Sequence, residues 1–114
     1  MLKDAPQRTL LAPQQLRLVL DYIGEHLDQS LGLQELAAIA SVSPYHFSRL
    51  FKQTIGLSPH QYVIRCRLDR AQDLLQHSTE SIAEVAVAVG FAHQSHLNYH
   101  FKRAFGITPK MLRS

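Results

Sequence analysis

The sequence predicts an all-α protein that contains the same short helical unit twice. Leucine and alanine are the most abundant residues, with 17 and 11 copies, and no stretch alternates apolar and polar residues with a period of two. Proline and glycine stand at positions typical of helix starts and helix ends. One segment also recurs about 50 residues later in the chain. These observations predict helices without strands.

Length and composition exclude several classes of protein. A chain of 114 residues fits one small domain, or two very small units. The single cysteine, Cys66, excludes an internal disulfide and a zinc site built from cysteines. No apolar run approaches the roughly 20 residues that span a bilayer, and the first residues lack a signal-peptide pattern. We therefore expect a cytoplasmic protein that does not contact a membrane.

The first half of the chain is expected to hold an arm and one helical subdomain. Residues 1–12 show no periodicity and are expected to form a flexible arm. Pro13 suits the first position of a helix. Apolar residues of one helix face follow at Leu16, Val19, Leu20, Ile23 and Leu27. A short second helix is marked by Leu33, Leu36, Ala37 and Ala40.

The next helices are defined by their caps. Ser43 is the expected N-cap of a third helix with Pro44 in its first turn, and Gly56 ends it. That helix places Phe47, Leu50 and Phe51 inward. Ser58 and Pro59 start a long helix to about residue 77. We therefore predict a subdomain at 13–57, with its motif at about 33–54, and a connecting helix at 58–77.

Residues 78–114 repeat the earlier unit and form a second predicted subdomain, with its motif at about 81–104. Phe51-Lys52, Gly56 and Pro59 recur 50 residues later as Phe101-Lys102, Gly106 and Pro109. Upstream of the turn the offset is 49, as Glu35 and Ala37 return as Glu84 and Ala86. The second copy therefore has one extra residue in its turn, within 90–93.

Each copy has the pattern of a helix-turn-helix. A short helix with small residues is followed by a tight turn and by a helix that opens with polar side chains. In a DNA-binding helix-turn-helix this second helix enters the major groove. A plain helical hairpin in a protein-interaction module is the alternative. The distribution of charge favours the DNA-binding interpretation, because residues 43–67 and 85–114 each hold four basic residues and no acid.

Both motifs resemble those of a known family of transcriptional regulators, the AraC/XylS family. The first is Leu33-x-x-Leu36-Ala37-x-x-Ala40-x-x-Ser43-Pro44-x-x-Phe47-x-Arg49-x-Phe51-Lys52. The second is Ile82-x-x-Val85-Ala86-x-x-x-Gly90-Phe91-x-x-x-Ser95-x-Leu97-x-x-x-Phe101-Lys102-x-x-Phe105-Gly106-x-Thr108-Pro109. The resemblance covers about residues 14–113.

The resemblance implies a homeodomain-like, all-α module of seven helices that binds double-stranded operator or promoter DNA. Such modules usually form the C-terminal half of a longer regulator with an effector-binding domain, which is not expected within this chain. The chain is therefore expected to be either an excised DNA-binding domain or a stand-alone member of the family. The resemblance favours activation of transcription through RNA polymerase, and it implies no enzyme activity and no cofactor. A non-specific DNA-binding protein is a further alternative.

The outward face of each second helix supplies the candidate DNA contacts. In the first copy they are Tyr45, His46, Ser48, Arg49 and Lys52. Arg49 is the main candidate, because a guanidinium can bind guanine O6 and N7 together, whereas Lys52 suits a phosphate. In the second copy the candidates are Gln94, Ser95, His96, Asn98, Tyr99 and Lys102. Gln94 and Asn98 suit adenine.

The second copy departs from the family at Tyr99, which stands where the first copy has Arg49 and where many members carry arginine. We therefore expect the second copy to contribute less to sequence specificity. A connecting helix of about 20 residues is roughly 30 Å long, close to the spacing of about 34 Å between successive major grooves. One chain could then engage two consecutive grooves.

Two chemical alternatives were weighed on the same residues. His93, His96 and His100 share one helical face, which is a possible three-imidazole metal site. No acidic residue lies near them in sequence to orient the rings, so no metal is expected. Cys66 as a nucleophile has no glycine-rich turn or paired carboxylates near it in sequence. The sequence therefore favours DNA binding over a metal site and over a cysteine-based enzyme.

Overall fold

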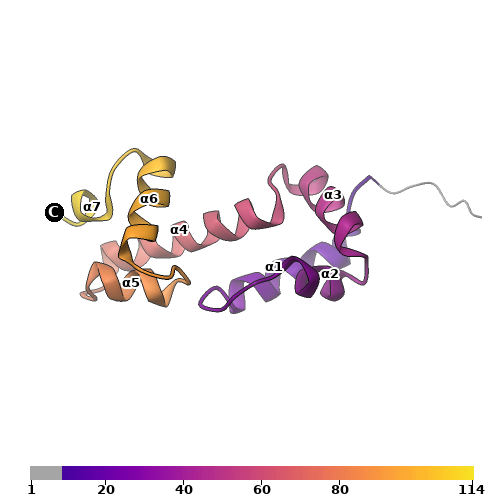
Figure 1. Ribbon diagram of the computed structural model, residues 1–114, viewed down its shortest axis with the longest axis horizontal. Coiled ribbons are helices and arrows are strands. Elements are labelled where there is room, and N and C mark those ends of the chain that lie inside the picture. Colours follow the sequence, from indigo (N-terminus) through magenta and orange to yellow (C-terminus); the bar gives the residue numbers. More distant parts are fainter. Residues whose placement is uncertain (1–8) are drawn as a thin grey trace, which may run out of the picture. The chain divides into compact units, whose positions relative to one another are not determined.

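The computed structural model describes residues 9–114, which form helices and no strands (Figure 1). The helices are α1 (Pro13–Glu25), α2 (Leu33–Ala40), α3 (Pro44–Ile55), α4 (Pro59–His77), α5 (Ile82–Ala88), α6 (Gln94–Phe105) and α7 (Pro109–Arg113). The predicted all-α class with seven helices is confirmed. No helix in this part of the chain combines the length and the apolar character needed to cross a membrane.

The helices divide into two compact units. Among the described residues, the first unit consists of 9–25 together with Leu31–Tyr62, and the second consists of His26–Ser30 with Val63–Ser114. Helix α4 therefore supplies residues to both units. Each unit contains one helix-turn-helix, α2–α3 in the first and α5–α6 in the second.

In the first unit, α2 packs against both α1 and α3. The interior is lined by two aromatic rings of α3, Phe47 and Phe51, which are fully buried and lie 5.5 Å apart between centroids. Tyr62 closes the cluster edge-on, 5.6 Å from the Phe51 ring. The Tyr22 hydroxyl of α1 donates to the Glu35 carboxylate of α2, and this hydrogen bond raises the pKa of Tyr22.

The N-terminal end of the first unit is held by polar contacts. Of the predicted arm, residues 1–8 lie outside the described residues. Leu11 is buried, and its backbone N–H donates to Thr54 Oγ1 at 2.9 Å. The Ala12 N–H donates to Gln15 Oε1 at 2.9 Å. The chain is therefore attached to the first unit from Leu11 onward, two residues before α1 begins.

The second unit has a continuous apolar core. Its buried members come from α4, α5, α6 and the turn between the last two: Leu68, Ala71, Leu75, Val85, Ala86, Val89, Phe91, Leu97 and Phe101. Partly buried residues pack around this core, among them Phe105 at the end of α6 and Leu112 in α7. This core holds α6 so that only one of its faces reaches solvent.

Two details of the predicted helices are wrong. The first helix ends at Glu25, short of Leu27, because residues 26–30 leave it and pack as part of the second unit. There Leu27 is buried, and its carbonyl accepts a hydrogen bond from Arg67 Nε at 3.0 Å. Leu33 was expected on the apolar stripe of the second helix, but it is exposed at the helix start.

Candidate nucleic-acid interface

The turns of the two helix-turn-helix motifs share one hydrogen-bond pattern. In the first, the Val42 N–H donates to Ala37 O at 3.1 Å, and in the second the Phe91 N–H donates to Ala86 O at 2.9 Å. These donors and acceptors are related by the offset of 49 seen in the sequence. The residue that the second turn adds is Ala92, which lies between Phe91 and the N-cap of α6.

Each turn contains one residue in the left-handed region, but the second of these residues is surrounded much more closely by other parts of the chain. The residue is Ser41 in the first motif, with φ 62°, and Gly90 in the second, with φ 103°. A Cβ added at Gly90 would lie 2.0 Å from Leu27 O and 2.5 Å from Arg67 Nε. Only glycine fits there, because the 26–30 loop and Arg67 lie against the turn.

Each of the two second helices begins with a side-chain cap. Ser43 accepts a hydrogen bond from the His46 N–H at the start of α3, as predicted, and Pro44 occupies the first turn. At the start of α6, His93 takes the capping place, and its Nδ1 accepts from the His96 N–H at 3.3 Å. An imidazole caps in this way only while Nδ1 carries no proton.

Helix α3 turns its polar face to solvent. Phe47, Leu50 and Phe51 are buried. The predicted contacts of this helix lie on the opposite face: Tyr45, His46, Arg49 and Lys52 are exposed and Ser48 is half-buried. Tyr45 is 71% exposed, and the Arg49 guanidinium lies 5.8 Å from the centre of its ring. The contact with the ring leaves the Arg49 side chain exposed to solvent.

Helix α6 has the same division. Leu97 and Phe101 are buried, and Phe105 is half-buried against the core. The predicted contacts again lie outward: Gln94, Ser95, His96, Tyr99 and Lys102 are exposed and Asn98 is half-buried. The structure thus gathers each predicted set on one face of its own helix. The DNA contacts themselves stay a prediction.

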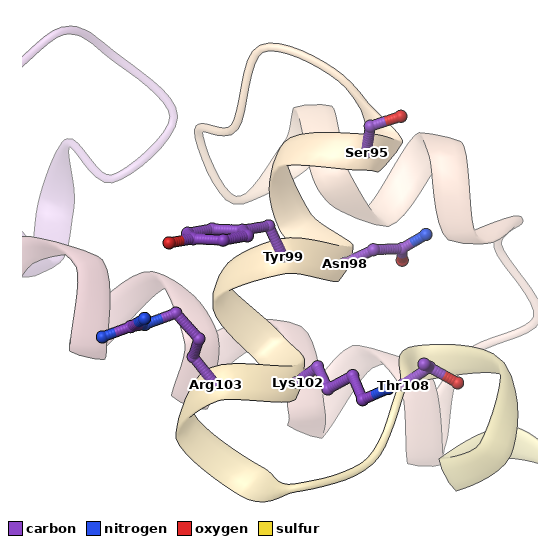
Figure 2. A pocket seen from close by; sticks show the side chains of 6 residues that line it. All are labelled: Ser95, Asn98, Tyr99, Lys102, Arg103 and Thr108. Carbon is purple, nitrogen blue, oxygen red and sulfur yellow. The ribbon is translucent and has the colours of Figure 1, made fainter.

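One basic residue of α6 was missed by the sequence analysis. The Arg103 guanidinium lies 5.7 Å from the centre of the Tyr99 ring. Figure 2 shows the two side chains pointing to the same side of α6. An open depression is lined by Arg103 together with Ser95, Asn98, Tyr99, Lys102 and Thr108. The available signal was the Tyr-x-x-x-Arg spacing, which both helices carry.

Other basic residues of the acid-free segments are engaged inside the second unit. Arg67 donates to Leu27 O and, at 2.7 Å, to Gln29 O, and burial lowers the pKa of its guanidinium. Arg65 pairs with Asp69 at 3.4 Å and lies over the Phe105 ring. These two arginines hold the fold, so Arg49 and Lys52 are the basic residues of 43–67 that α3 presents.

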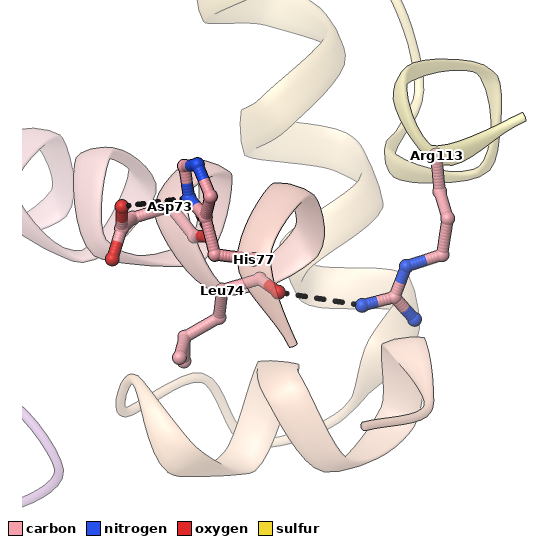
Figure 3. A network of polar contacts seen from close by, with 4 residues as sticks. All are labelled: Asp73, Leu74, His77 and Arg113. Atoms are coloured by element: carbon pink, nitrogen blue, oxygen red, sulfur yellow. Dashed lines mark hydrogen bonds and ion pairs between the residues drawn. The ribbon is translucent and has the colours of Figure 1, made fainter. Parts of the chain in front are cut away.

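Arg113 has a similar internal role at the end of α4 (Figure 3). It donates to the carbonyls of Leu75 at 3.2 Å, Ser78 at 3.3 Å and Glu80. Leu75 lies in the last turn of α4, whose carbonyls lack partners within the helix, whereas Ser78 and Glu80 lie in the segment that follows, so one guanidinium joins the helix end to that segment. His77, in the last turn, pairs with Asp73 at 3.1 Å.

The histidines of the second motif pack on an aromatic ring. His96 lies edge-on to Phe91 with centroids 5.3 Å apart, and His100 stacks on the same ring at 5.8 Å. The rings of His96 and His100 are 4.9 Å apart. In the described part of the chain, no three His, Cys, Asp or Glu side chains are grouped so that they could hold a metal ion.

Comparison with known proteins identifies the fold. A family model described as a helix-turn-helix domain matches residues 36–114. The DNA-binding domain of AdpA, solved in complex with a target DNA, is 36% identical, with a TM-score of 0.83 over 87% of this chain and 89% of that one. An AraC-type regulator structure from Chromobacterium violaceum is 31% identical, with a TM-score of 0.82 over 88% and 89% of the two chains. The chain belongs to the AraC-type helix-turn-helix family.

Curated relatives of this AraC-type chain are longer proteins. The probable transcriptional regulator LumQ of Photobacterium leiognathi is 37% identical over 81% of this chain and 37% of its own length. The transcriptional activator RhaS of Klebsiella pneumoniae is 36% identical over 86% of this chain and 35% of its own. The chain therefore spans little more than a third of each.

Proposed function

We propose that this chain is the sequence-specific DNA-binding domain of a transcriptional regulator and that α3 and α6 are its recognition helices. The observation that carries the proposal is the location of both polar faces. Each lies on the second helix of a helix-turn-helix, directly after the tight turn, and points away from a packed core. The similarity to a domain solved with its target DNA supports the same role.

The proposed roles of the residues follow from their chemistry. Arg49 binds a guanine edge, since its guanidinium is open to solvent and no acid lies in residues 43–67. Lys52 meets a phosphate. In α6, Gln94 and Asn98 read adenine, while Ser95 and His96 lie beside them for further contacts.

The proposed complex uses two consecutive major grooves. Helix α4 has 19 residues and is therefore about 28 Å long. Successive major grooves on one face of DNA lie about 34 Å apart. Bending of the DNA would reduce this spacing toward the length of α4. A single chain would then bind a site of two short blocks without a second copy.

The regulator is proposed to activate transcription in the cytoplasm. RhaS, one of the relatives, is named a transcriptional activator. Contact with RNA polymerase is the proposed route. Because the relatives are nearly three times as long, an effector-binding domain is expected to belong to the complete regulator rather than to these residues.

Selection of bound sequences from a random duplex pool tests this function. We expect enrichment of a site with two conserved blocks about one helical turn apart, 10 to 10.5 base pairs between centres. Binding should weaken steeply with salt, because phosphate contacts release counterions.

The alternatives give different results in the same experiment. A non-specific DNA-binding protein would retain duplexes at low salt without enriching any sequence. A helical protein-interaction module would bind no labelled duplex at low salt and micromolar protein. Either result would overturn the proposed function.

A further inference from the structure

The two recognition helices carry the same tyrosine–arginine pair at different positions along the helix. In α3 the pair is Tyr45 and Arg49, the second and sixth residues of the helix, with 5.8 Å between guanidinium and ring centre. In α6 it is Tyr99 and Arg103, the sixth and tenth residues, at 5.7 Å. The pair in α6 is therefore displaced by four residues, or about 6 Å along the helix axis.

This displacement changes what the arginine can reach. In a helix-turn-helix, the N-terminal residues of the recognition helix contact base edges, while later residues leave the groove beside the sugar–phosphate backbone. Arg49 is near the N-terminal end of α3, whereas Arg103 is near the C-terminal end of α6. The repeat places Gln53, which is uncharged, at the position of Arg103 in the first motif.

The surroundings of Arg103 suit a phosphate. Lys102 and Arg103 both line the depression on α6, and Figure 2 shows the Lys102 side chain extending toward Thr108. Thr108 and Ser95 add hydroxyl donors on its edge. Residues 85–114 contain no acid, and within residues 9–114 neither cation forms an ion pair. Arginine and lysine with hydroxyl groups are the usual partners of DNA phosphates.

We propose that this face of α6 binds phosphates of the DNA backbone, with Arg103, oriented by Tyr99, on one side of the helix and Lys102, which extends toward Thr108, on the other. The inference rests on the proposed function and refines it. The second motif anchors the chain on the backbone with its displaced pair, while the first motif uses the equivalent pair to read bases.

The test compares Arg103→Gln, which introduces the residue found at the repeat-related position 53, with Arg103→Lys. Binding is measured to the selected duplex and to a random duplex of equal length, at several salt concentrations. Arg103→Gln should weaken both duplexes equally, by about five- to tenfold at 0.1 M salt, and reduce the salt slope by about 0.9. Arg103→Lys should retain most of the affinity, because a phosphate accepts either cation.

A duplex with single phosphates replaced by neutral methylphosphonates locates the contact. One replacement should weaken the wild-type protein and have no further effect on Arg103→Gln. Lys110→Gln, an exposed charge outside the depression, is the control and should lose less than twofold.

Three results would overturn the site while leaving the proposed function intact. The first is unchanged binding of Arg103→Gln to both duplexes. The second is a loss for Lys110→Gln as large as that for Arg103→Gln. The third is an Arg103→Gln variant that weakens only the selected duplex and changes base preference. By contrast, a wild-type protein that binds no duplex contradicts the proposed function itself.

Discussion

The two helix-turn-helix motifs share their backbone arrangement and their buried positions, but they differ in their exposed side chains. Their turns share a backbone hydrogen-bond pattern, and the apolar positions of α3 and α6 are buried in both. The exposed positions have diverged: Arg49 corresponds to Tyr99, and Gln53 corresponds to Arg103. The turns also differ, since Ser41 stands in open surroundings and Gly90 lies against a loop and an arginine.

This comparison separates what the motif needs from what the motif can vary. Burial and the turn hydrogen bonds place the second helix, so these features recur in both copies. The exposed face contributes little to folding, so its residues can differ between the copies: the arginine of the tyrosine–arginine pair is assigned to base reading in α3 and to backbone binding in α6.

The largest expected effect is at the second turn. Gly90→Ala combines a left-handed backbone with a Cβ placed 2.0 Å from Leu27 O, and it should lower the free energy of unfolding by about 3 kcal/mol. The repeat-related variant Ser41→Gly should change it by less than about 1 kcal/mol. Urea unfolding measures both. Equal effects would mean that the two turns are not different in packing.

Arg49→Ala should have the next largest effect, now on binding. Loss of a bidentate contact to guanine should cost about 1–3 kcal/mol on the selected duplex and broaden the base preference. Titration of the selected duplex and of a random duplex gives the two free energies. If both duplexes lose the same amount, Arg49 does not read a base and the proposed difference between the motifs fails.

Lys52→Ala should have a smaller effect that does not depend on sequence. Loss of one phosphate contact should make the salt slope shallower by about 0.9 on both duplexes. Arg65→Ala is the matched control, because that arginine pairs with Asp69 and lies over Phe105. An unchanged slope for Lys52→Ala would remove the proposed contact.

The smallest effect concerns the cap of α5, which α2 lacks. Ser81 and Glu84 form a reciprocal capping box, and hydrogen bonds from Ser81 lower the pKa of Glu84, whereas the N-cap of α2 is Gly32 without a side-chain bond. The lowered pKa means that the folded state favours the carboxylate. Its contribution is therefore present above the unfolded-state pKa and is lost as the pH falls through the folded-state pKa.

Glu84→Gln should accordingly be less stable than the wild type at neutral pH, and the difference should shrink in acid. Thermal unfolding across pH measures it. Ser81→Ala removes the hydroxyl but keeps the backbone N–H that donates to Glu84 Oε1, so Glu84→Gln in that background should retain most of its effect. A difference independent of pH would mean that the carboxylate is not stabilised by the cap.

Local patterns in the sequence predict most of this architecture. The caps Ser43 and Gly56 bound α3 as expected, and the apolar spacing identifies Phe47, Leu97 and Phe101 as core residues. These features depend on residues within a few positions of one another, so a linear sequence displays them. The outward location of the candidate contacts follows from the same periodicity.

Only the tertiary structure decided which basic side chains are exposed and could contact DNA, and which turn residue must be glycine. Arg67 and Arg113 belong to the basic segments, yet they bind backbone carbonyls 33 to 40 residues away in the chain. Gly90 is confined by Leu27, and the Arg103 guanidinium lies over the Tyr99 ring. By itself the sequence determined the helices and their buried faces, because helix caps and periodicity act locally. The partners of each arginine depend on packing between distant segments, and no local pattern records that packing.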